Sequence, residues 1–88
     1  MIQREVSIKN RAGLHTRPAA SLVKLAAKFK AEFFIEKDGM EINGKSIIGV
    51  MTLAAEQGST LTLLFDGPDE EQACQAMEDL IRRGFDEE

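Results

Sequence analysis

The sequence predicts an α+β fold, an open-faced β-sandwich in which a four-stranded antiparallel sheet carries three helices on one face. Three observations favour this class. Segments with the two-residue period of a strand alternate with segments of helical period, in the order βαββαβα. The dipeptide Asp38-Gly39 is a strong signal for a hairpin between the second and third strands. A chain of 88 residues can bury one core between two layers.

The order of the elements limits how the strands can be arranged. A strand–helix–strand unit crosses over right-handedly, and after a hairpin the last strand can fill the gap between the first two. The expected strand order is therefore 1-4-2-3, with residues 1–88 forming a single domain. The second face of the sheet would be open to water, and Phe34 and Leu64 are expected to pair there.

The first strand and the first helix differ in their hydrophobic periods. Alternation over Ile2–Ile8 predicts a half-buried strand, with Arg4 as the exception on its apolar side. After the turn-rich segment 10–13, a helical period begins at Thr16. The expected apolar stripe of this helix consists of Leu22, Leu25, Ala26 and Phe29, and its exposed stripe of Arg17, Ser21, Lys24 and Lys28.

The middle of the chain predicts a hairpin, a short helix and a fourth strand. The hairpin strands are Glu32–Lys37 and Met40–Asn43. Ser46 is in the position of an N-cap before a helix over roughly Ile47–Ala54, and a strand over Thr60–Phe65 follows. The strand residues expected to face the core are Phe33, Ile35, Met40, Ile42, Leu61, Leu63 and Phe65.

The last helix has the clearest end signals. Asp69 is expected to cap it, with Gln72 three residues later completing a capping box, and Gly84 can close its other end. Cys74 is expected to be a small core residue, and the acidic tail 86–88 a solvated end. The expected core stripe is Ala73, Ala76, Met77 and Leu80.

The composition argues against several classes of function. The net charge of −4 disfavours nucleic-acid binding, which needs an excess of Lys and Arg. His15 and Cys74 are the only histidine and the only cysteine, so we expect no internal disulfide, metal or cofactor. No apolar run approaches the roughly 20 residues of a membrane span and no signal peptide is recognisable, which predicts a cytoplasmic protein.

The residues around His15 have the chemistry of an anion site at the start of a helix. Free N–H groups and the helix dipole favour negative charge there, and Pro18 fits the first helical turn. Gly13 permits a tight turn before the histidine, and Arg17 adds a fork of donors suited to phosphate. A neutral imidazole can attack phosphorus, and the resulting P–N bond is labile enough for the phosphoryl group to be passed on. The alternative is that His15 is only a cap or a surface residue.

The segment Asn10–Ala19, NRAGLHTRPA, closely resembles the active-site segment of HPr, the histidine-containing phosphocarrier family of the bacterial phosphoenolpyruvate-dependent sugar phosphotransferase system. Gly44–Met51, GKSIIGVM, resembles the family's signature around its regulatory serine, and the length and element order match as well. The resemblance implies that His15 accepts phosphate on Nδ1 from enzyme I and delivers it to the A domain of a sugar-specific enzyme II. It places Arg17 beside the phosphate and makes Ser46 the target of an ATP-dependent kinase, HPr kinase/phosphorylase.

A docking surface is expected next to His15. Val50 and Leu53 can serve the core with Ile47 at its edge, which leaves Ile48 and Met51 as exposed apolar residues. The basic stripe on the first helix would suit an acidic partner. The alternative is that Ile48 is simply half-buried and that the lysines keep the helix soluble. The residues expected to contact partners are Thr16, Ala20, Lys24, Ile47, Ile48 and Met51.

Three functions remain open from the residues alone. The first is a monomeric phosphoryl carrier, a substrate of other enzymes rather than an enzyme. Phosphate on Ser46 would add about −1.5 to −2 charges and weaken the binding of an acidic partner, unless Ser46 is merely an N-cap. The second is a regulatory binding paralogue acting mainly through Ser46. The third is a stand-alone hydrolase or metal enzyme, for which the sequence supplies no second general base or ligand set beside His15. The presence of His15 and Arg17 favours the carrier.

Overall fold

The computed structural model describes residues 1–87, and its strands and helices follow the predicted order. The elements are β1 (Ile2–Ser7), α1 (Thr16–Ala26), β2 (Glu32–Lys37), β3 (Met40–Asn43), α2 (Ile47–Thr52), β4 (Thr60–Asp66), α3 (Glu70–Arg82) and a 3₁₀ turn, η1 (Gly84–Asp86). The strands form one antiparallel sheet in the order β1-β4-β2-β3, which confirms the predicted topology. The second predicted helix was too long by two residues, because α2 ends at Thr52 rather than at Ala54.

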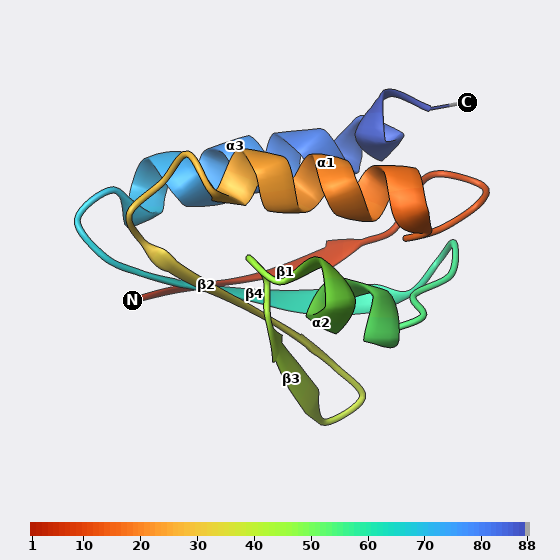
Figure 1. Ribbon diagram of the computed structural model, residues 1–88, viewed down its shortest axis with the longest axis horizontal. Coiled ribbons are helices and arrows are strands. Elements are labelled where there is room, and N and C mark those ends of the chain that lie inside the picture. The colour runs from red at the N-terminus through yellow and green to blue at the C-terminus, as the bar shows by residue number, and fades with distance from the viewer. Residues whose placement is uncertain (88) are drawn as a thin grey trace.

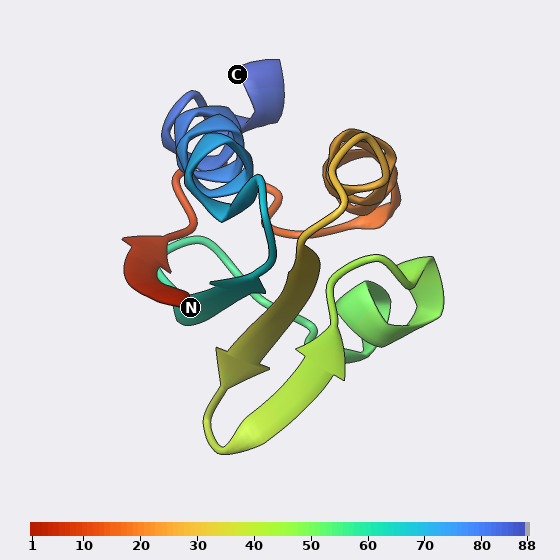
Figure 2. The ribbon, with the colours of Figure 1, turned by 90° about the vertical axis from the view of Figure 1, so that its left-hand side faces the viewer.

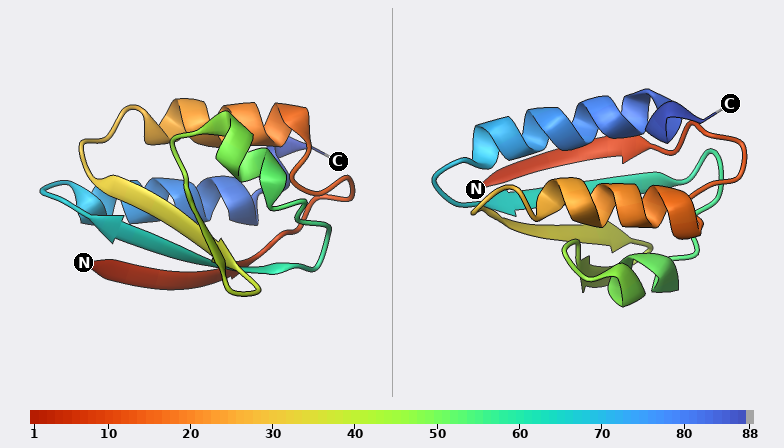
Figure 3. Two further views of the ribbon diagram at one scale, coloured as in Figure 1. Left: turned by 60° about the horizontal axis from the view of Figure 1, so that its bottom comes forward. Right: turned by 45° about the horizontal axis from the view of Figure 1, so that its top comes forward.

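The helices cover one face of the sheet. α1 and α3 lie side by side above the strands, and α2 lies next to α1 beside β3 (Figures 1 and 2). Seen from the helix side, α1 occupies the middle position between α3 and α2 (Figure 3). Within residues 1–87, none of the helices is long and apolar enough to cross a bilayer.

The hydrophobic core fills the space between the sheet and the helices. The rings of Phe33 on β2 and Phe65 on β4 are register partners and stack with centroids 4.8 Å apart. Burying each such side chain contributes about 1.5–3 kcal/mol. Cys74 is buried on α3, as predicted, while Ala76 lies at the margin of the buried stripe and is half-buried. The largest fully buried side chains are Phe65, Ile8, Leu22, Ile35, Leu61, Leu63, Met77, Ile81, Val50 and Pro18.

Two predictions about which strand residues are buried have different outcomes. Phe34 and Leu64 are register partners and half-buried on the uncovered face, as expected. The prediction that Met40 faces the core is wrong, because 43% of its surface is exposed. Met40 pairs with Lys37 beside the hairpin turn, and Figure 1 shows this hairpin extending away from α1 and α3.

The start of α3 differs from the predicted capping box. Asp69 occupies the N-cap position, but its carboxylate accepts hydrogen bonds from the backbone N–H groups of Lys30 and Ala31, each at 2.8 Å. These bonds, the one from Lys30 foremost, hold the pKa of Asp69 below its ordinary value despite the opposing effect of desolvation. Asp69 therefore ties the connection between α1 and β2 to the start of α3. Gly84 closes α3 with a φ of 66°, as predicted.

Candidate functional site

The connection from β1 to α1 places His15 at the N-cap of α1. Its backbone is extended, with φ −85° and ψ −167°, and its carbonyl accepts a hydrogen bond from the N–H of Ala19 at 2.9 Å. The preceding Leu14 is buried, and its N–H donates to the carbonyl of Ala55 at 2.8 Å. The backbone of His15 is thus held from both sides, while 41% of its side chain remains exposed.

Gly13 is required for this close approach of two loops. Its φ of 75° lies in the left-handed region, which side chains disfavour. A Cβ at this position would lie 2.6 Å from the carbonyl oxygen of Ala55, which is shorter than any tolerated contact. The tight turn predicted before the histidine is present, and it also seats the loop against the connection between α2 and β4.

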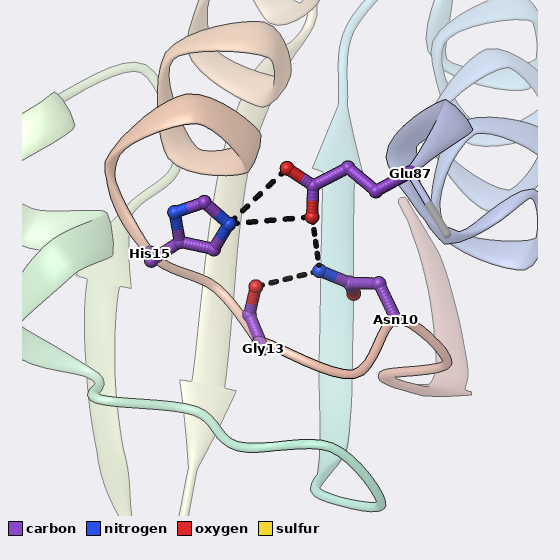
Figure 4. A network of polar contacts seen from close by, with 4 residues as sticks. All are labelled: Asn10, Gly13, His15 and Glu87. Atoms are coloured by element: carbon purple, nitrogen blue, oxygen red, sulfur yellow. Dashed lines mark hydrogen bonds and ion pairs between the residues drawn. The ribbon is translucent and has the colours of Figure 1, made fainter.

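The imidazole of His15 contacts a carboxylate from the far end of the chain. Its Nε2 lies 3.1 and 3.2 Å from the two carboxylate oxygens of Glu87, 72 positions away in the sequence (Figure 4). The other ring nitrogen, Nδ1, points away from Glu87 (Figure 4). The prediction that the tail is a solvated end is wrong for Glu87, whose side chain is only 22% exposed. Asp86 is exposed, and Glu88 lies outside the described residues.

Asn10 joins this carboxylate to the loop that carries His15. Its side chain is buried, and Nδ2 donates to the carbonyl of Gly13 at 2.7 Å and to Oε1 of Glu87 at 3.0 Å (Figure 4). Because both neighbours are acceptors, the amide must present its NH₂ group to them. Its Oδ1 is left without a partner among the residues the structure describes. The loop and the tail are therefore linked through one buried amide.

A left-handed turn after α3 brings Glu87 to the histidine. Gly84, Phe85 and Asp86 have φ values of 66°, 58° and 61°. Each left-handed non-glycine residue costs about 1–3 kcal/mol, and burial of the Phe85 side chain contributes about 1.5–3 kcal/mol, which offsets the cost at Phe85. The turn is held further by the bond from the N–H of Glu87 to the carbonyl of Gly84, at 3.0 Å.

The electrostatic environment of Glu87 keeps it ionised. Desolvation raises the pKa of its carboxyl, but hydrogen bonds from Asn10 and His15 and the nearby charge of Arg17 together outweigh it. The pKa of Glu87 therefore lies below its ordinary value, and a carboxylate faces His15 at neutral pH. Arg17 itself is exposed on the first turn of α1.

The other predicted site residues lie on α1 and α2. The exposed apolar side chains of α2 are Ile47, Ile48 and Met51, 38%, 76% and 42% exposed, and we call them the α2 patch. A shallow hollow lined in part by Ala20, Lys24 and Ile47 connects this patch to α1. A second hollow is lined in part by His15 and Met51. Thr16 is exposed at the start of α1. The predicted partner-contact residues therefore lie on one surface beside His15.

Ser46 caps α2, as its sequence position predicts. Its Oγ accepts a hydrogen bond from the N–H of Gly49 at 3.2 Å, and the residue is exposed. The hydroxyl thus lies at the start of the helix that carries the α2 patch. A group attached to this hydroxyl would lie next to Ile47, the first residue of the patch.

Comparisons with known proteins agree on one family. A family model described as the PTS HPr component phosphorylation site matches residues 2–83. The HPr-like protein Crh of Halalkalibacterium halodurans is 48% identical over 77 residues, covering 88% of this chain and 92% of that protein. The phosphocarrier protein HPr of Treponema pallidum is 44% identical over 88 residues, the full length of both chains. A crystal structure of HPr from Thermoanaerobacter tengcongensis superimposes with a TM-score of 0.96 at 45% identity, covering 100% of this chain and 99% of that one.

Proposed function

Because the chain belongs to the HPr family of phosphocarrier proteins of the phosphotransferase system, we propose that it accepts a phosphoryl group on His15 from enzyme I and passes it to the A domain of a sugar-specific enzyme II. Proteins of this family are phosphoryl carriers, not enzymes. The observation that supports this role most directly is the half-exposed imidazole at the N-terminus of α1, two residues before Arg17. We further propose that residues 1–88 act as one monomeric domain, because every proposed site residue lies on this one chain. We propose the cytoplasm as its location, as expected for a phosphocarrier of the phosphotransferase system.

The geometry suits a transient phosphate on the imidazole. A phosphoryl group on Nδ1 would lie at the positive end of α1, where first-turn N–H groups have no intrahelical acceptor. The guanidinium of Arg17 supplies donors for phosphate oxygens on the same turn. Neither group forms a covalent bond to the phosphate, so the site stabilises the phosphoryl group without preventing its release.

The α2 patch is the proposed docking surface for both enzymes. Exposed apolar side chains beside a reactive group are typical of protein interfaces. The neighbouring α1 and the residues just after it carry the exposed basic residues Arg17, Lys24 and Lys28. One surface would serve donor and acceptor in turn, because His15 must reach the active site of each. An acidic rim on the partner would complement the basic residues of α1.

The substitution Ile48→Glu is expected to impair phosphate acceptance through docking. Ile48 is 76% exposed, so the variant should fold normally, while a negative charge in an interface with an acidic partner is repelled. The KM for this protein as a substrate of enzyme I should rise about tenfold or more, with a smaller change in kcat. Steady-state kinetics of phosphorylation measure both values.

Met40→Glu is the matched control for this substitution. Met40 is 43% exposed, close to the 42% of Met51 in the patch, but it lies at the hairpin on β3. Met40→Glu should leave the KM near the wild-type value, whereas Met51→Glu should raise the KM as Ile48→Glu does. Equal effects of Met40→Glu and Ile48→Glu would contradict docking through the α2 patch.

A second candidate function is regulation through Ser46, favoured by the similarity to an HPr-like protein named Crh and by the exposed hydroxyl beside the patch. Phosphate there would be tolerated at the start of α2 and would place negative charge beside Ile47, which should weaken binding of an acidic partner. The presence of His15 supports the carrier as the main role, with Ser46 as a control point on it.

One experiment tests the proposed function. The protein is incubated with phosphoenolpyruvate and catalytic enzyme I, and the protein-bound phosphate is quantified before and after mild acid. We expect one acid-labile phosphate for each molecule, since a P–N bond is cleaved by acid and a serine phosphate is not. A parallel reaction with ATP and HPr kinase/phosphorylase should give an acid-stable phosphate that is absent from Ser46→Ala. Wild-type protein that takes up no acid-labile phosphate would contradict the carrier function.

A further inference from the structure

We propose that Glu87 is a positioning residue for His15: its carboxylate accepts the hydrogen bond from Nε2–H and so leaves the lone pair of Nδ1 free for phosphorus. The inference deepens the proposed function and rests on it. Glu87 lies beyond residues 2–83, the span that matches the family model. It extends the site to a second segment of the chain.

The contact between His15 and Glu87 has the distances of a hydrogen bond shared between two acceptor oxygens. Nε2 lies almost equally far from the two carboxylate oxygens, at 3.1 and 3.2 Å. Because an ionised carboxylate can only accept, the proton of a neutral imidazole in this contact lies on Nε2. Nδ1, which points away from Glu87 in Figure 4, then carries the lone pair. The orientation of the ring and the choice of nucleophilic nitrogen follow from one contact.

Glu87 is held in place by groups other than the histidine. Asn10 donates to its Oε1 at 3.0 Å and, at 2.7 Å, to the carbonyl of Gly13 in the loop before His15. The buried Phe85 anchors the tail two residues earlier, in a left-handed turn. A freely moving tail would need neither the strained turn nor the buried amide. The carboxylate is therefore presented to the imidazole by the fold.

The same contact would act during both steps of the relay. On acceptance, the lone pair of Nδ1 forms the bond to phosphorus, and the bond from phosphorus to the donor group breaks, its electron pair leaving with the donor. The proton stays on Nε2, so the ring takes a positive charge beside the carboxylate of Glu87, which stabilises it. On delivery, the acceptor attacks phosphorus, the P–Nδ1 bond breaks and its electron pair returns to Nδ1.

The test combines kinetics with spectroscopy of the free protein. Glu87→Gln removes the charge, Glu87→Ala removes the acceptor as well, and Asp86→Asn removes the same charge one residue earlier. Asp86 is a matched control because its carboxylate contacts Arg83, at 2.9 Å, and not the ring of His15. For Glu87→Gln we expect a kcat of phosphorylation by enzyme I about tenfold lower, with the KM within about twofold of wild type. Asp86→Asn should match the wild type in both.

Nitrogen-15 NMR of the ring supplies a readout that needs no enzyme. His15 is the only histidine, so its ring signals need no assignment. Exchange of Nε2–H with water should be slow in the wild type and in Asp86→Asn and faster in Glu87→Ala. The unfolding midpoint of each variant shows whether the tail still packs.

The outcomes separate this inference from the proposed function. A kcat for Glu87→Gln equal to that of Asp86→Asn, or an Nε2–H exchange rate independent of Glu87, would overturn the positioning role even if the wild type carries phosphate. If the wild type accepts no phosphate while Nε2–H exchange still depends on Glu87, the carrier function fails and the contact with the ring stands.

Discussion

Replacing His15 by alanine is expected to abolish acid-labile phosphate uptake from enzyme I and phosphoenolpyruvate. His15 is the only histidine, and the sequence offers no second imidazole that could substitute for it. Arg17 and the N-terminus of α1 can bind phosphate through hydrogen bonds but cannot form a covalent bond to phosphorus. The expected loss is therefore complete rather than partial, to the background of a reaction without the protein.

The control for this variant is its stability. The side chain of His15 is 41% exposed and Leu14 remains buried, so His15→Ala should unfold at a urea concentration close to that of the wild type. Ser46→Ala should keep full acid-labile uptake in the same assay. Acid-labile phosphate on folded His15→Ala would show that another residue is the acceptor.

The substitution Gly13→Ala is expected to destabilise the protein strongly. Its φ of 75° disfavours a side chain by roughly 1–2 kcal/mol, and the clash of a Cβ with the Ala55 carbonyl adds about 1–3 kcal/mol. Both costs apply together, so the free energy of unfolding should fall by about 2–5 kcal/mol. Phosphate acceptance should fall as well, because the loop that carries His15 can relieve the clash only by moving.

Gly58→Ala separates the two costs. Gly58 has a similar φ of 89°, but a Cβ there would meet no atom of the described residues within 4 Å. It should therefore lose only the conformational part, about 1–2 kcal/mol, and keep its rate of phosphate acceptance. Urea unfolding followed by circular dichroism measures both variants. Equal losses for Gly13→Ala and Gly58→Ala would contradict the close loop contact.

The fold could be predicted because its signals are local. The alternation of strands, the helical stripes and the Asp38-Gly39 turn each depend on neighbouring residues, and the right-handed crossover then determines the strand order. The N-cap at Ser46 and the exposure of Ile48 were predictable for the same reason, since both depend on periodicity within one short helix. Local patterns also placed His15 at the start of a helix.

Choices between distant partners could not be predicted in this way. An acidic residue before a helix is expected to cap it, yet Asp69 bonds to the N–H groups of Lys30 and Ala31, 39 and 38 residues earlier. Glu87 lies in an acidic tail without any periodic pattern, and its turn requires Phe85 in a left-handed conformation that bulky residues rarely adopt. Burial of Phe85 and the hydrogen bonds of the turn stabilise it, and burial is a property of the whole fold.

Transfer of the phosphate to an acceptor decides whether the chain is a carrier. The phosphorylated protein is separated from enzyme I and phosphoenolpyruvate and mixed with an equimolar enzyme II A domain. Phosphate should leave His15 and appear on the acceptor one for one, and Ile48→Glu should slow this step. Phosphate that stays on His15, or that is released only as inorganic phosphate, would contradict the carrier function.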